Sequence, residues 1–395
     1  MTASEQLAQF AAGSKALPKL CREYKKERAT VHLKELVGGA LSFYAAAAVA
    51  KTGGVHIFVA EDRDAAAYLL NDFYNLLDEK QVYFFPSSYK RSAAYGAEDA
   101  QGVVQRTTAM NAVRGFTKGY LVVCTYPEAL AERVVDAATL QRDTIAVKLG
   151  DKISIAVLED ALADANFTRV DFVYEPGQYS VRGGIVDVFS YSESKPYRID
   201  FFGDEVDSIR RFNISSQLSA DKLDRVEIVP NLNAGEAPRV SFVQFAGSSA
   251  TCWFYDADYV LRRVNDLRRK VLADMEEPGQ IDRLLTSRNV LLRDMAGNSV
   301  VALRDNLPER PATAAVVFDT APQPKFNKNF EMLADDMIRN SLRGYATYIL
   351  SENKVQVERL ENIFHQIGRG QAAVRSLSVT LHEGFVDNDL KLCLY

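Results

Sequence analysis

The sequence lacks the patterns that mark membrane, secreted and metal-binding proteins. Its longest apolar run, around residues 45–50, is far shorter than the ~20 residues that a helix needs to cross a bilayer. The first residues carry neither the basic segment nor the apolar segment of a secretory signal. The four cysteines are scattered and show no Cys-x-x-Cys spacing, so neither a zinc site nor a disulfide framework is supported. We therefore expect a cytoplasmic protein without a metal site.

An excess of positive charge is also missing. The chain has 47 Lys and Arg residues against 52 Asp and Glu residues, and its net charge of −5 argues against a protein whose main task is to neutralise phosphates. Two basic clusters lie at residues 19–28 and 262–270, on segments with a helical pattern that also carry acidic residues. We interpret both clusters as solvated helix faces, and binding of nucleic acid by them remains the alternative.

The 395 residues are too many for one ordinary core, so we expect two to four domains. In residues 1–140, short apolar runs alternate with helical patterns, the first of them at 7–28. This order predicts a parallel sheet that is covered by helices on both faces. Residues 141–217 are richer in strands and turn signals, which indicates a small α+β insertion.

The remaining sequence divides into two parts. Residues 218–318 contain strand-like runs, the first at 225–229, and a long helical pattern, and we expect them to complete the first domain. Residues 319–395 alternate again between helix and strand patterns, which predicts a small α/β domain. The chain ends inside an apolar run at 390–395, so we expect the sequence to be part of a longer protein.

A working phosphate-binding loop is missing as well. Gly38 and Gly39 lie between a predicted strand and a predicted helix, where such a loop would lie. The loop requires the form G-x-x-x-x-G-K-[ST], in which main-chain amides and the lysine hold phosphates and the hydroxyl binds magnesium. Counted from Gly38, the last three positions are Phe43, Tyr44 and Ala45, and every other register of the two glycines also fails.

This failure favours a structural interpretation of the two glycines. We interpret Gly38 and Gly39 as a tight strand-to-helix turn that has no nucleotide to bind. We also expect the aromatic rings of Phe43 and Tyr44 to occupy the space that phosphates would need.

The strongest motif lies between residues 167 and 210. Residues 176–187 read Pro-Gly-Gln-Tyr-Ser-Val-Arg-Gly-Gly-Ile-Val-Asp, and residues 197–202 read Tyr-Arg-Ile-Asp-Phe-Phe ahead of a Gly-Asp turn. This combination resembles the second domain that the excision-repair protein UvrB shares with the transcription-repair coupling factors, and it looks specifically like the latter. A weaker likeness covers residues 33–133 and 383–387, so that the whole chain resembles the amino-terminal region of that family.

The resemblance implies a fold and the lack of an enzymatic activity. The fold class is α/β and multi-domain: a UvrB-like domain with a degenerate P-loop, an inserted α+β domain and a small C-terminal α/β domain. UvrB carries an intact nucleotide-binding loop at this place, whereas the coupling factors have lost it. UvrB also projects a long aromatic hairpin, and the corresponding loop at 87–97, with Tyr89 and Tyr95, looks too short to separate DNA strands. ATP and magnesium would belong to motor domains that are absent from this chain.

The resemblance also implies a binding site for UvrA on the inserted domain. Arg169 and Arg182 match positions where the family presents arginines to UvrA, and Tyr179 and Phe189 are candidate apolar companions, although core burial suits Phe189 better. A third basic position of UvrB is Ser180 here. Arginine suits this role because its planar guanidinium binds carboxylates and is frequent at interface hot spots.

A structural role for one of these arginines stays open. Arg182 could instead pair with Asp187 or Asp200 inside the domain and hold the sheet edge. In that case its loss would reduce stability as much as binding.

Three functions are compatible with the sequence. The first is a non-catalytic adaptor that brings UvrA to stalled RNA polymerase. The resemblance then implies a monomer whose docking surface is masked by the C-terminal domain of the intact protein, with RNA polymerase and DNA bound through absent domains. The second is an ATP-dependent DNA-loading protein like UvrB. The third is a general DNA-binding module that uses the basic helices.

Overall fold

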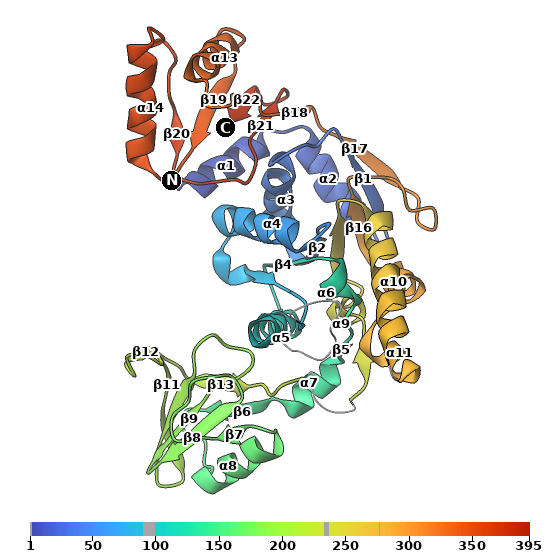
Figure 1. Cartoon of the computed structure of the whole chain (residues 1–395), viewed down its shortest axis with the longest axis vertical. Coiled ribbons are helices and arrows are strands. Elements are labelled where there is room, and N and C mark those ends of the chain that lie inside the picture. The colour runs from blue at the N-terminus through green and yellow to red at the C-terminus, as the bar shows by residue number, and fades with distance from the viewer. Residues whose placement is uncertain (1, 90–98, 233–236, 276) are drawn as a thin grey trace.

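The computed structural model describes residues 2–89, 99–232, 237–275 and 277–395 of the chain (Figure 1). A seven-stranded sheet with its helices forms the middle of the molecule, a strand-rich unit projects from one end, and a unit built from the last residues lies at the other. The chain is therefore a mixed α/β protein, in agreement with the predicted class. None of its described helices combines the length and the apolar character that a bilayer crossing requires.

The central sheet is parallel at every pairing, in the order β17-β1-β16-β15-β2-β4-β3. Its strands are β1 (Thr30–Lys34), β2 (Gly54–Val59), β3 (Val82–Phe84), β4 (Tyr120–Thr125), β15 (Thr251–Phe254), β16 (Ser299–Ala302) and β17 (Ala314–Val317). The sheet thus combines strands from both sides of the insertion. This confirms the predicted parallel sheet, although β16 was not predicted.

Helices cover both faces of this sheet. Successive residues of a buried strand point to opposite sides, so each strand contributes apolar side chains to two cores. Phe58 and Trp253 join a core with α1 (Ala3–Ala12), α2 (Ala16–Tyr24), α3 (Ala40–Thr52) and α4 (Arg63–Leu76). Their neighbours Ile57 and Cys252 join a second core on the other face. The helices of that second core include α5 (Ala100–Gly115), α6 (Pro127–Ala131), α9 (Phe242–Ala246), α10 (Ala257–Asp274) and α12 (Arg288–Asp294).

The predicted helix at 7–28 is wrong in one respect, because two helices share this segment. Gly13 ends α1, and its N–H bonds to the carbonyl oxygens of Phe10 and Ala11. Pro18, which has no N–H to donate, lies in the first turn of α2, where a proline is tolerated. The hydroxyl of Ser14 accepts a bond from the main-chain N–H of Ala16 and so stabilises the new start.

The inserted unit is built on a six-stranded sheet in the order β12-β11-β10-β9-β8-β7. Its strands are β7 (Thr168–Arg169), β8 (Gln178–Arg182), β9 (Ile185–Val188), β10 (Tyr197–Phe202), β11 (Glu205–Phe212) and β12 (Ser219–Lys222). Helix α8 (Ile155–Asp164) covers one face through Leu158 and Leu162. A strand pair of β6 (Ile145–Lys148) and β13 (Arg225–Ile228) completes the same core, so the packed unit continues beyond residue 217.

The last residues form a five-stranded sheet in the order β18-β21-β22-β19-β20. Its elements are β18 (Thr320–Pro322), α13 (Phe330–Leu342), β19 (Ala346–Leu350), α14 (Lys354–Gln366), β20 (Ser376–Leu377), β21 (Phe385–Asp387) and β22 (Leu392–Leu394). The two predicted helices, near 330–343 and 354–366, are confirmed. Phe385 and Leu394 belong to the same core as α3, so this unit packs directly on the central domain.

The predicted place of Phe43 and Tyr44 is wrong. Both rings point into the core, where Phe43 contacts Phe385 and Tyr44 contacts Phe318. The Tyr44 hydroxyl also donates a hydrogen bond to the carboxylate of Asp387. The two rings therefore join the central domain to the last unit and do not occupy the space in front of Gly38 and Gly39.

Candidate interaction surface and cavity

Arg182 belongs to an ionic network on the open face of the six-stranded sheet. Its Nη2 lies 2.5 Å from Oδ2 of Asp187, and Arg198 binds both carboxylate oxygens of Asp187 at 2.7 and 2.9 Å. Arg182 also donates to the carbonyl oxygen of Asp171 at 2.9 Å. The hydrogen bond to Asp187 raises the pKa of the Arg198 guanidinium. The pairing of Arg182 with Asp187 is thus confirmed, and Asp200 pairs with Arg210.

Arg169 is much more exposed than Arg182. Its guanidinium pairs with Glu159 of α8 at 2.6 Å, and 60% of its side chain is accessible. Because this pair is in contact with water, it contributes at most about 1 kcal/mol to stability. Arg169 is therefore available to a partner at little cost to the fold.

The structure places Arg169 and Arg182 on opposite faces of the sheet. Arg169 is in register with Tyr179 on the neighbouring strand, so the two side chains share a face, which is the face covered by α8. Arg182 is three residues further along β8 and therefore points to the other face. A partner that contacts both arginines must reach around the edge formed by β7.

Tyr179 and Phe189 are buried, with 4% and 5% exposure. Their rings therefore pack beneath the surface and cannot contact a partner directly. The exposed aromatic side chains are others, which sequence reasoning missed. Phe172 and Tyr174, in the loop between β7 and β8, are half-exposed or more. The guanidinium of Arg182 lies 4.9 Å from the centroid of the Phe172 ring. The candidate surface therefore consists of two arginines and two aromatic rings around the β7 edge.

Comparison with known proteins identifies the unit that carries this surface. Residues 145–233 match a family described as the UvrB interaction domain. This segment is therefore similar to UvrB interaction domains, and it is called the UvrB interaction domain here. Its match includes β6 and β13, the strand pair that completes the core of the inserted unit.

The chain is also homologous to transcription-repair coupling factors over half of its length. It is 27% identical to the protein of Bacillus subtilis and 27% identical to that of Escherichia coli, each over 199 residues. These matches cover 50% of this chain but 17% of each relative. The Haemophilus influenzae protein is 35% identical over 101 residues, which are 26% of this chain and 9% of that protein. The expected resemblance is therefore confirmed for part of the chain, and the chain spans less than a fifth of these relatives.

Outside the UvrB interaction domain, the turn at Gly38 and Gly39 leads from β1 into α3, as predicted. Gly38 adopts a left-handed φ of 56°, which favours glycine. The segment that links β20 to β21, residues 378–384, crosses this turn and is named the crossing segment below. A Cβ atom on Gly39 would collide with the carbonyl oxygen of Glu383. Main chain therefore lies directly against the two glycines.

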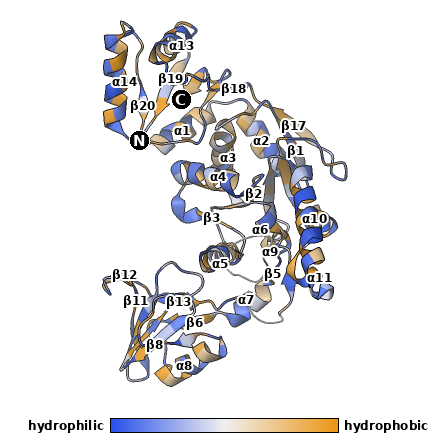
Figure 2. Cartoon of the chain, viewed as in Figure 1, coloured by the Kyte–Doolittle hydropathy of each residue, from blue (hydrophilic) through white to orange (hydrophobic). Residues whose placement is uncertain are grey.

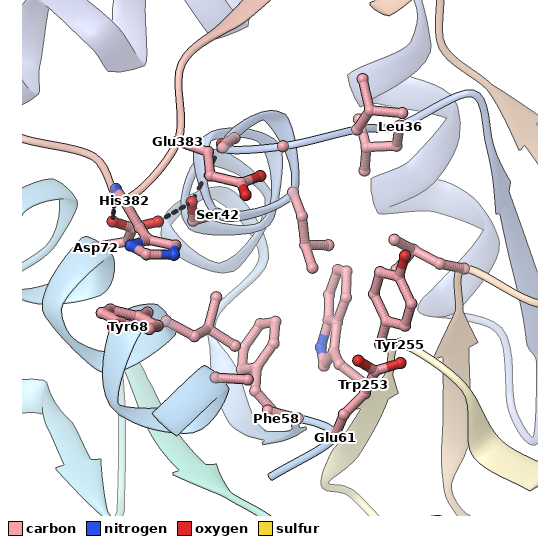
Figure 3. A pocket seen from close by; sticks show the side chains of 18 of the residues that line it. Leu36, Ser42, Phe58, Glu61, Tyr68, Asp72, Trp253, Tyr255, His382 and Glu383 are labelled. Atoms are coloured by element: carbon pink, nitrogen blue, oxygen red, sulfur yellow. Dashed lines mark hydrogen bonds between the residues drawn. The ribbon is translucent and has the colours of Figure 1, made fainter. Parts of the chain in front are cut away.

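Several contacts hold the crossing segment against α4, which Ser42 of α3 also binds. The main-chain N–H of His382 donates to Asp72 at 2.7 Å, and the hydroxyl of Ser42 donates to the same carboxylate at 2.6 Å. The rings of His382 and Tyr68 are stacked at 3.6 Å. Burial raises the pKa of the Asp72 carboxyl, and these two hydrogen bonds oppose that rise. Figure 3 shows this group beside an open cavity.

The basic cluster at 262–270 lies on α10, a helix that Figure 2 shows as mostly hydrophilic. Its arginines are paired with acidic residues: Arg262 with Asp258, Arg263 with Glu128, Arg268 with Asp282 and Arg269 with Asp266. This pairing supports a solvated helix face and weakens the case for a phosphate-binding surface. The loop that was compared with the UvrB hairpin falls mostly on residues 90–98, including Tyr95, which lie outside the described residues.

Proposed function

We propose that this chain recruits UvrA through its UvrB interaction domain, as the amino-terminal region of a cytoplasmic transcription-repair coupling factor. The observation that carries the proposal is the match of residues 145–233 to that domain family, together with homology to coupling factors over half of the chain. In this role the chain is an adaptor. The intact protein would act on stalled RNA polymerase and DNA through other domains, one of which would mask the UvrA surface at rest.

The surface around β7 suits such a partner. Arg169 and Arg182 offer guanidinium groups from the two faces of the sheet, and Phe172 and Tyr174 add exposed aromatic area between them in sequence. Arginine and aromatic side chains are the residue types that contribute most to protein interfaces. UvrA would supply carboxylates that replace Glu159 as the partner of Arg169.

We also propose that this chain neither binds nor hydrolyses ATP. The carbonyl oxygen of Glu383 lies against Gly39, where main-chain amides of a phosphate-binding loop would face a phosphate. The sequence supplies neither the lysine nor the hydroxyl of that loop. A calorimetric titration with magnesium and ATP should give no saturable heat, and micromolar affinity would instead support an enzyme that resembles UvrB.

Calorimetric titration of UvrA with single variants tests the recruitment. Arg169→Ala and Arg182→Ala should each weaken binding about tenfold, because truncation of an arginine hot spot costs more than ~1 kcal/mol. Arg269→Ala, an exposed and paired arginine on α10, is the matched control and should leave the affinity unchanged. If both UvrB-interaction-domain variants bind UvrA like the control, the proposed surface is wrong.

A further inference from the structure

The cavity beside the crossing segment has a volume of about 400 Å³. It lies where β2 and β15 end and α3 begins, and it is lined from five separate parts of the chain. A volume of this size falls in the range of ~300–1,000 Å³ that is typical of small-molecule sites. Neither the UvrB interaction domain nor its candidate surface contributes to it.

Aromatic rings form much of its wall. Phe58, Tyr68, Trp253 and Tyr255 line the cavity, and Figure 3 shows these rings around the open space. Trp253 is held in place because its indole N–H donates to Nδ1 of the buried His56 at 3.1 Å. The faces of aromatic rings carry partial negative charge, which attracts cations.

The charged groups of the cavity have one sign. The carboxylates of Glu61 and Glu383 lie at different sides of it in Figure 3, and both residues are exposed. The buried carboxyl of Asp72 also lines the cavity, although it is already hydrogen-bonded. Among the described residues that line the cavity, none is a lysine or an arginine. The nearby Arg304 is held against Tyr255 and Asp256.

We propose that this cavity binds a small organic cation, with a guanidinium or ammonium group on a short apolar body. The cationic group would lie between the carboxylates of Glu61 and Glu383 and against the aromatic rings, and the apolar body would contact Phe58 and Trp253. The same charges repel a phosphate. The cavity lies where a nucleotide pocket would lie in this fold, and it would thus select a cation instead of an anion.

The protein contains one tryptophan, Trp253, so its fluorescence reports directly on the cavity. The probe is N-acetyl-L-arginine amide, and N-acetyl-L-citrulline amide is its neutral isostere. Titration of the whole chain should give a saturable change in emission with the arginine probe and a response at least tenfold weaker with citrulline. Saturation-transfer NMR on the same samples measures binding independently of the fluorescence.

Variants of the two exposed carboxylates complete the test. Glu61→Gln and Glu383→Gln should each weaken the arginine probe about tenfold, because each removes one charge-assisted contact. Glu79→Gln changes an exposed carboxylate that does not line the cavity and should bind like the original chain. Equal binding of the arginine and citrulline probes, unchanged affinity in both variants, or no binding by either method would overturn the proposal.

Discussion

The ionic network of the UvrB interaction domain allows a quantitative test in which Asp187 is replaced by asparagine. The Asp187 side chain is 2% exposed and is the common partner of Arg182 and Arg198. Asparagine has nearly the same shape, so the substitution removes the charge and leaves the packing. Two guanidinium groups would then face a neutral amide, and one of them, that of Arg198, has little access to water.

The expected cost follows from the burial of the three groups. Breaking a fully buried ion pair costs about 3–5 kcal/mol, because the remaining charge has no partner. Arg198 is largely buried, whereas Arg182 is about one-third exposed and partly hydrated. We therefore expect the lower end of the range, about 3 kcal/mol, for Asp187→Asn. Arg182→Ala should cost only about 1 kcal/mol, because Arg198 still neutralises Asp187.

Amide hydrogen exchange of the whole chain measures both effects where they occur. Exchange from β9 and β10 should become about a hundredfold faster in Asp187→Asn, since ~1.4 kcal/mol corresponds to a factor of ten. Exchange from β2 and β4 of the central sheet serves as an internal control and should be unchanged. If Arg182→Ala destabilises β9 and β10 as much as Asp187→Asn does, Arg182 is chiefly structural. That result would refute the reasoning that Arg198 neutralises Asp187 and leaves Arg182 available to a partner.

Two further predictions concern the central domain. In Gly39→Ala, the new Cβ atom would collide with Glu383, and overpacking of this kind costs ~1–3 kcal/mol, so amide exchange in the crossing segment should become about tenfold faster. Gly115→Ala is the control, because a Cβ atom there meets no atom within 4 Å, and exchange in the crossing segment should stay unchanged. Burial lowers the pKa of His56 to about 4 from its ordinary 6.5. Between pH 6.5 and pH 4 the unfolded chain therefore binds more protons than the folded chain, and the free energy of unfolding should fall by about 3 kcal/mol as the pH drops through this range. Urea titrations at several pH values measure this loss, and His56→Asn should not show it.

Much of the central fold followed from local sequence patterns. The runs that became β2 and β4 are apolar, and the helix formers between Gly39 and Gly53 mark α3 clearly. Strand β16, Ser299–Ala302, was not predicted, although it is no shorter than β15 and β17. Its burial comes from β1 and β15 on either side, which are far away in sequence.

The two arginines of the candidate surface were predicted from the sequence, but its aromatic residues and its geometry were not. The motif around Arg182 identified the domain, yet the opposite directions of Arg169 and Arg182 depend on the register between β7 and β8. The exposure of Phe172 and Tyr174 depends on a loop that leaves the sheet. The domain boundaries, apart from the inclusion of β13 in the inserted core, remain predictions.

The cavity could not be predicted from sequence at all. It joins the start of α3, the ends of β2 and β15 and the crossing segment, and no pattern links Glu61 to Glu383 over more than 300 positions. The same holds for the contact between Gly39 and Glu383, which depends on how the last unit packs on the central domain.

Hydrogen exchange of the chain with and without UvrA tests the recruitment most directly, because it locates the contact as well as detecting it. Protection on addition of UvrA should appear in residues 168–182, around Arg169, Phe172 and Arg182, and should be absent from α10 and α14. The absence of any protection at saturating UvrA, or protection confined to the central or the last unit, would contradict a docking site on the UvrB interaction domain.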